Sequence, residues 1–248
     1  MVETSVRIGI IFLPTDCTGP AELHTIVEKC TDIITQSVNC IFPPDVEVLN
    51  QNTYEYALER LNDTIDCLRP IGSFSCIGVS CTSFGFAVGA NNIRSIINSI
   101  HPDVTVIDMT ESLFKAARIL SIKRLLVLTA YKSDLNSILK KRIELENFEI
   151  VEMNRLGLDT DYEIYCVEES EIIKSISNLK SNTTNLDSLG IIVSCSALRM
   201  LRPGFIDELE NITGVPIISS MQAFCWNMLR TTGIKDQFEG FGTLFKNH

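Results

Sequence analysis

The sequence predicts an α/β protein built from two similar open parallel-sheet lobes, related by a pseudo-twofold axis, with the site in the crevice between them. Short β-branched runs alternate with longer amphipathic stretches along the chain, which is typical of a parallel sheet covered by helices on both faces. The second half of the chain also repeats motifs of the first half. We expect residues 1–115 and 116–231 to form the lobes, with residues 232–248 packing back on the first.

The individual elements follow from these runs. The expected strands are the short apolar segments Val6–Phe12, Val46–Leu49, Ile77–Ser80, Val104–Ile107, Arg124–Thr129, Glu149–Met153, Leu189–Ser194 and Val215–Ile218. The expected helices are the amphipathic segments Ala21–Ser37, Tyr54–Leu68, Gly89–Ile100, Thr110–Leu120, Ser133–Leu145, Glu168–Leu179, Gly204–Glu210 and Ser219–Thr231.

The internal repeat places two cysteines at matching positions. The segment IGVSCTS at 77–83 is echoed by GIIVSCS at 190–196, and each contains a Ser-Cys pair directly after an expected strand. The strands at 6–12 and 104–107 are echoed, at a similar separation, by those at 124–129 and 215–218. Ligands of parallel α/β sheets bind outside the carboxyl ends of the strands. Duplication therefore predicts that Cys81 and Cys195 lie on the crevice between the lobes.

Composition excludes several classes of function. The chain carries 21 Lys and Arg against 31 Asp and Glu, a net charge of −10, which disfavours nucleic acids and anionic membranes as partners. No apolar run approaches the roughly 20 residues that span a bilayer. The apolar run Ile8–Leu13 reads as a first strand and not as a secretion signal, so we expect a cytoplasmic protein whose nine cysteines are reduced.

The sequence also predicts chemistry without a metal or cofactor. The cysteines form no zinc-binding framework, and the glycines match neither a dinucleotide fold nor a phosphate-binding loop. The three histidines are scattered, which argues against a Ser-His or Cys-His hydrolase.

Two thiols facing one substrate suit two kinds of reaction. A thiol at a strand end, facing a helix N-terminus, is expected to be held as thiolate. One sulfur could remove a proton while the other delivers a proton to the opposite face, which is racemisation. Alternatively, one sulfur could add to an activated double bond while the other protonates the neighbouring carbon. The hydroxyls of Thr82, Ser83 and Ser196 could hold carboxylate oxygens beside either sulfur.

The two Ser-Cys segments, SCTS at 80–83 and SCSALR at 194–199, resemble those of the aspartate/glutamate racemase superfamily. The branch they resemble contains maleate cis–trans isomerase and arylmalonate decarboxylase. Further similar segments run nearly end to end through the chain, namely Gly9–Pro14, Thr129–Tyr131, Pro216–Ala223 with Trp226, Arg230 and Gly233, and Gly240–Leu244.

The resemblance implies roles for individual residues. Cys81 would be the nucleophile of an isomerase or one of two bases of a racemase, and Cys195 the opposing acid or base. Decarboxylases of this branch usually have glycine at the position of Cys81. The residues implied in binding the substrate are Pro14, Thr15, Asp16, Thr82, Ser83, Tyr131, Asp161 and Ser196.

The leading expectation is a cofactor-independent isomerase of a small dicarboxylate, acting by maleate-type cis–trans isomerisation through a covalent cysteine adduct. The alternative is a two-base racemase of an acidic amino acid or related carbon acid. A decarboxylase of a substituted malonate and a non-catalytic ligand-binding relative are less favoured. Asp16 and Asp161 stand where family isomerases carry asparagine, so a substrate with an amine is also considered. By analogy with the family, a homodimer is the expected assembly.

Overall fold

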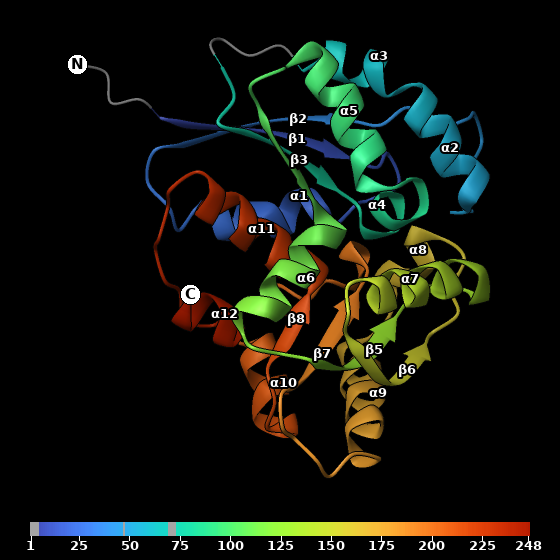
Figure 1. Ribbon diagram of the computed structural model, residues 1–248, viewed down its shortest axis with the longest axis vertical. Coiled ribbons are helices and arrows are strands. Elements are labelled where there is room, and N and C mark those ends of the chain that lie inside the picture. The colour runs from blue at the N-terminus through green and yellow to red at the C-terminus, as the bar shows by residue number, and fades with distance from the viewer. Residues whose placement is uncertain (1–4, 47, 69–72) are drawn as a thin grey trace.

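The computed structural model describes residues 5–46, 48–68 and 73–248, and it contains two four-stranded parallel sheets (Figure 1). The first sheet has the order β2-β1-β3-β4 and the second the order β6-β5-β7-β8. The strands are β1 (Val6–Phe12), β2 (Ile33–Asn39), β3 (Cys76–Ser80), β4 (Thr105–Asp108), β5 (Arg124–Thr129), β6 (Glu149–Arg155), β7 (Leu189–Ser194) and β8 (Ile217–Ser219).

The two sheets repeat one another strand for strand. Each strand of the first sheet has a counterpart four strands later, at the same place in the order. The register also repeats, because Phe12 at the end of β1 pairs with Ser80 of β3, and Thr129 at the end of β5 pairs with Ser194 of β7. The predicted fold class is confirmed, and the two Ser-Cys pairs leave equivalent strands at equivalent levels.

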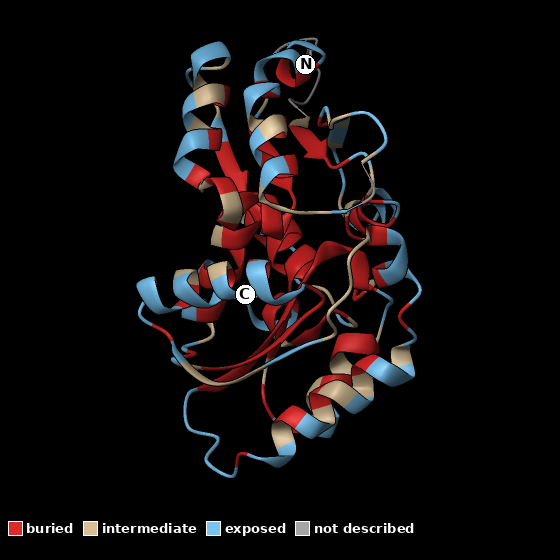
Figure 2. Ribbon diagram, turned by 90° about the vertical axis from the view of Figure 1, so that its right-hand side faces the viewer, coloured by how far each residue is buried: buried red, intermediate tan, exposed pale blue. Residues whose placement is uncertain are grey.

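Helices connect and cover the strands. They are α1 (Gly19–Val27), α2 (Gln51–Glu59), α3 (Leu61–Asp66), α4 (Thr82–Val88), α5 (Ala90–Ile100), α6 (Met109–Ile119), α7 (Ser133–Leu145), α8 (Asp161–Tyr165), α9 (Glu169–Ser181), a 3₁₀ turn (Ser196–Leu198), α10 (Phe205–Thr213), α11 (Ser220–Thr231) and α12 (Gly242–Asn247). The central strands β3 and β7 are buried along their whole length, as expected for strands with helices on both faces (Figure 2).

The helix that follows the last strand of each sheet packs across the boundary between the lobes. Helix α11 follows β8 but lies on β3, where a methyl group on Gly78 would come within 2.5 Å of the Phe224 ring. Helix α6 follows β4 and contacts β8, and Ile122, just after it, lies against Gly190 of β7. The two helices also pack against each other at the centre of the molecule (Figure 1). This exchange fixes the two strand ends relative to one another.

The C-terminal segment contacts both lobes. We expected residues 232–248 to pack back on the first lobe, and Lys29 of that lobe lies over the Phe241 ring, 5.4 Å from its centre. Helix α12 also contacts α10 and β8, and the Gly242 amide donates to the carboxylate of Asp207 in α10. The boundaries predicted at 115/116 and 231/232 thus fall within or beside the exchanged helices.

One strand was placed wrongly by the sequence analysis. The second strand is Ile33–Asn39, which we had included in a helix over 21–37, whereas α1 ends at Val27. Asp32, with a φ of 63°, turns the chain between the two elements. Of the segment expected as a strand at 46–49, residues 46, 48 and 49 are not in a strand, and Glu47 lies outside the described residues.

Candidate active site

Cys81 lies at the junction of β3 and α4 and is 4% exposed. It is the residue before the first turn of α4, and its sulfur accepts a hydrogen bond from the Phe84 amide at 3.3 Å. The Ser83 hydroxyl lies 3.4 Å from the same sulfur. The thiol at the end of the strand therefore lies next to the hydrogen-bonding groups of Ser83 and Phe84.

Cys195 occupies the matching position after β7 and is 6% exposed. Its backbone amide donates to Ser220 Oγ at 3.1 Å, and Thr82 Oγ1 donates to the same oxygen at 2.7 Å. Ser220 is the first residue of the exchanged helix α11. Through these two hydrogen bonds it connects the segment carrying Cys81 to the segment carrying Cys195.

The loop between β1 and α1 reaches across the crevice. Asp16 is buried, and its Oδ1 accepts from the Thr18 and Gly19 amides at 3.0 and 2.8 Å and from the Thr18 hydroxyl at 3.0 Å. Its Oδ2 accepts from the Ser196 hydroxyl of the opposite lobe at 3.0 Å. Asp16 and Ser196, both predicted to bind substrate, thus bind one another in this structure.

Two further predicted residues meet at the mouth of the crevice. The Thr15 hydroxyl donates to the carboxylate of Asp161, the first residue of α8, and both line a surface hollow with Val46, Thr160 and Tyr162. Pro14 in the same loop is exposed. Both cysteines, by contrast, are buried.

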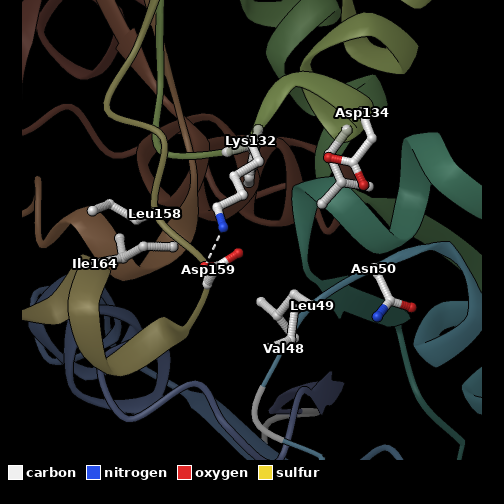
Figure 3. A pocket seen from close by; sticks show the side chains of 10 residues that line it. Val48, Leu49, Asn50, Lys132, Asp134, Leu158, Asp159 and Ile164 are labelled. Carbon is white, nitrogen blue, oxygen red and sulfur yellow. Dashed lines mark hydrogen bonds and ion pairs between the residues drawn. The ribbon is translucent and has the colours of Figure 1, made fainter.

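Tyr131 follows β5, as predicted, and its hydroxyl lies 3.2 Å from that of Ser194. Its ring packs edge-on against Phe86, with ring centres 5.6 Å apart. Tyr131 also borders a small pocket between the lobes. In this pocket the Lys132 ammonium points at the Asp159 carboxylate, while Val48 and Leu49 form the facing wall (Figure 3). The Leu49 amide bonds to the Asp159 carbonyl, which closes this side.

One residue of the site was missed by the sequence analysis. Tyr54 of α2 is completely buried, and its hydroxyl lies 2.6 Å from Ser83 Oγ. We had placed it in an amphipathic helix, where an apolar-facing tyrosine reads as core. A buried tyrosine needs a partner for its hydroxyl, and that requirement was the available signal.

The ionisation of the two thiols differs from expectation. We expected helix N-termini to hold both as thiolates. Burial instead raises the pKa of both Cys81 and Cys195, and nearby Asp161 raises them further. The hydrogen bonds from Ser83 and Phe84 oppose this rise at Cys81 but are outweighed by desolvation. The protein thus favours the thiol form of both cysteines.

The pKa of Asp161, at the crevice, is also shifted. Burial raises the pKa of Asp161 to about 6, against the lowering effect of the Thr15 hydrogen bond, and Asp16 adds to the rise. No ion pair reaches Asp161 from the described residues. The site thus contains a carboxyl group that gains or loses its proton near neutral pH.

Neither a metal centre nor a membrane-spanning helix is found among the described residues. Across residues 5–46, 48–68 and 73–248, no three His, Cys, Asp or Glu side chains are grouped so that they could hold a metal ion. Within the same ranges, no helix has the length and apolar character needed to cross a membrane.

Comparison with known proteins identifies the family. The family model described as arylmalonate decarboxylase matches residues 8–245. Arylmalonate decarboxylase of Bordetella bronchiseptica is 25% identical over 195 residues, covering 77% of this chain and 79% of that protein. The chain therefore belongs to the arylmalonate decarboxylase family, within the Asp/Glu racemase-like superfamily.

Solved structures share the fold. A liganded arylmalonate decarboxylase, in which a glycine is replaced by cysteine and a cysteine by serine, is 22% identical with a TM-score of 0.82, over 98% of this chain and all of that one (100%). A cysteine-to-serine mutant of Nocardia farcinica maleate cis–trans isomerase, with a covalently bound succinylcysteine intermediate, is 14% identical with a TM-score of 0.82, over 98% and 99% of the two chains. The fold thus hosts both a decarboxylase and an isomerase.

Proposed function

We propose that this member of the family is a cofactor-independent isomerase of a small unsaturated dicarboxylate, acting by maleate-type cis–trans isomerisation. The observation that carries the proposal is the pair of buried cysteines, one at the end of each duplicated strand. Ser220 connects the two segments that bear them, which supports a single site containing both sulfurs. A substrate between them would meet a sulfur from each lobe.

The reaction needs one thiolate and one thiol. Ionised Cys81 adds its sulfur to one alkene carbon, and the π electrons move to the other carbon and its carboxylate. Cys195 gives its thiol proton to that carbon, leaving a saturated thioether that rotates about its new single bond. Cys195 thiolate then removes a proton from the same carbon, the C–S bond breaks, and the trans product leaves Cys81 as thiolate.

Two comparisons support this reaction over decarboxylation. Decarboxylases of the resembling branch usually have glycine where this chain has Cys81. In addition, a relative of the same fold is a maleate cis–trans isomerase that carries a succinyl group on a cysteine. Cys81 would supply the nucleophile that such an adduct requires.

Conversion of maleate to fumarate by the purified protein, followed by proton NMR, tests the proposal. Cys81→Ala should abolish turnover, whereas Cys195→Ser should accumulate protein carrying one added substrate mass. Cys166→Ser, which changes an exposed cysteine, is the matched control and should keep wild-type turnover. Turnover that persists in Cys81→Ala, or no conversion by the wild type, would reject the assignment.

Racemisation of an acidic amino acid is the second candidate, and Asp161 favours it. After burial, charge on this buried carboxylate adds to the rise in the pKa of both cysteines, and the carboxylate could accept the ammonium group of an amino acid. The same thiols would then exchange the α-proton without an adduct. Solvent deuterium appearing at the α-carbon of a single enantiomer of aspartate or glutamate, with no fumarate from maleate, would select this reaction.

A further inference from the structure

Tyr54, Ser83 and Cys81 form a continuous chain of contacts that ends on one of the two sulfurs. The Tyr54 and Ser83 oxygens are 2.6 Å apart, and Ser83 Oγ is 3.4 Å from Cys81 Sγ. All three residues are buried, with Tyr54 fully shielded from solvent. The tyrosine itself comes from α2, far from the β3–α4 junction in sequence.

The direction of the hydrogen bonds in this chain depends on Tyr54. The Ser83 hydroxyl has one proton, and a thiolate can only accept. Burial raises the pKa of Tyr54 well above its ordinary value, so the phenol keeps its proton and can donate it to Ser83 Oγ. Ser83 is then free to donate to the sulfur, which makes it a stabiliser of ionised Cys81.

The second lobe has no serine at the position of Ser83, although Tyr131 there lies 3.2 Å from Ser194 Oγ. In the repeat, Ser80-Cys81-Thr82-Ser83 corresponds to Ser194-Cys195-Ser196-Ala197, so the position of Ser83 is taken by an alanine. The only hydroxyl next to Cys195 on its carboxyl side, that of Ser196, donates to Asp16. The two sulfurs are therefore equivalent in the fold but not in their donors.

We propose that Tyr54 is a positioning residue that, acting through Ser83, makes Cys81 rather than Cys195 the sulfur that carries negative charge during the reaction. The proposal rests on the proposed function, in which Cys81 is the nucleophile. It also reassigns Ser83, which we had expected to bind a substrate carboxylate. The charge difference between the sulfurs would thus be built in before substrate arrives.

The groups that face Cys81 set the background for a test. Asp161 of α8 and Asp16 of the β1–α1 loop disfavour the thiolate, while the Phe84 amide of α4 favours it. Burial is the main cause that raises the pKa of Cys195 and of Tyr131, and charge on Cys81 adds to the rise at each. None of these groups is altered by Tyr54→Phe, which removes a single oxygen atom.

The test measures thiolate formation at each cysteine without substrate. Iodoacetamide alkylation is followed across pH by mass spectrometry of the separate peptides, for the wild type, Tyr54→Phe, Ser83→Ala and the double variant. Tyr54→Phe should move the Cys81 midpoint upward by roughly one pH unit, slowing its alkylation about tenfold below the midpoint. The Cys195 profile should stay unchanged.

The double variant separates a relay from two independent effects. If Tyr54 acts through Ser83, the double variant should shift the Cys81 midpoint no further than Ser83→Ala alone. Tyr56→Phe, a half-buried tyrosine of the same helix that packs on Arg60, is the matched control and should leave the midpoint unchanged. Circular dichroism and the melting temperature report whether each variant is folded.

Two results would overturn the inference. One is an unchanged Cys81 midpoint in both folded Tyr54→Phe and folded Ser83→Ala. The other is a wild-type midpoint lower at Cys195 than at Cys81. Because the readout needs no turnover, a shifted Cys81 midpoint in a protein that does not isomerise maleate would keep the relay and reject only the proposed reaction.

Discussion

Asp161 is a titrating carboxyl group in the site proposed to bind a dicarboxylate between the two cysteines. Burial raises its pKa to about 6. Below that pH the neutral acid can donate a hydrogen bond to a substrate carboxylate, while above it the carboxylate repels a dianion. Asp16 is held differently, because its oxygens already accept four hydrogen bonds from Thr18, Gly19 and Ser196.

We therefore expect the KM for maleate to rise above about pH 6, by up to about tenfold per pH unit. Asp161→Asn keeps the shape of the side chain and removes its charge, so its KM should stay nearly flat across the same range. Steady-state kinetics between pH 5 and 8 measure this. Asp187→Asn, at an exposed position, should behave as the wild type. A flat wild-type KM would mean that Asp161 does not face the substrate carboxylates.

At the scale of elements, the sequence predicted the buried strands and the exposed strand β6 but missed the exposed strand β2. β3 and β7 are apolar throughout because both of their faces are covered, so their pattern is unambiguous. β2 is an edge strand with no fully buried residue, and its mixed pattern merged with the helix before it. The repeat located both cysteines, but Tyr54 reaches the site from another element, which no local pattern reveals.

The exchange of α11 onto the first sheet makes Gly78 a sensitive position. A methyl group there would meet Phe224 Cζ at 2.5 Å and Met228 Sδ at 2.7 Å. Gly78→Ala should therefore displace α11, lower the free energy of unfolding by about 1–3 kcal/mol, and disturb Ser220 at the start of the helix. The midpoint of urea unfolding and the turnover rate should both be lower than in the wild type.

A shorter partner side chain supplies the control for this prediction. Phe224→Leu removes the ring atoms that the new methyl group meets, so the double variant with Gly78→Ala should be more stable than the two single effects added together. Strict additivity of the two changes would show that α11 is not held against β3 at this point.

At the scale of the whole molecule, the lobes are joined by contacts that involve buried acids. Glu22 of α1 accepts from the Leu201 amide of the opposite lobe at 2.6 Å, and burial raises its pKa to about 8. Asp108, at the start of α6, has a pKa raised by burial to about 7. With Asp161, these groups keep protons in the folded protein that the unfolded chain releases.

This difference determines how stability depends on pH. In the unfolded chain these groups have their ordinary pKa values of 3.8 and 4.5, so between about pH 4 and 8 the unfolded chain binds fewer protons than the folded one. Stability must then fall as pH rises through this window.

Calorimetry should give a higher melting temperature at pH 5 than at pH 8. Glu22→Gln, which keeps the acceptor for Leu201, should reduce that difference, whereas Glu28→Gln, at an exposed position of the same segment, should not. A melting temperature that rises from pH 5 to pH 8 would show that these acids are ionised in the folded protein, and that the joined lobes open enough to hydrate them.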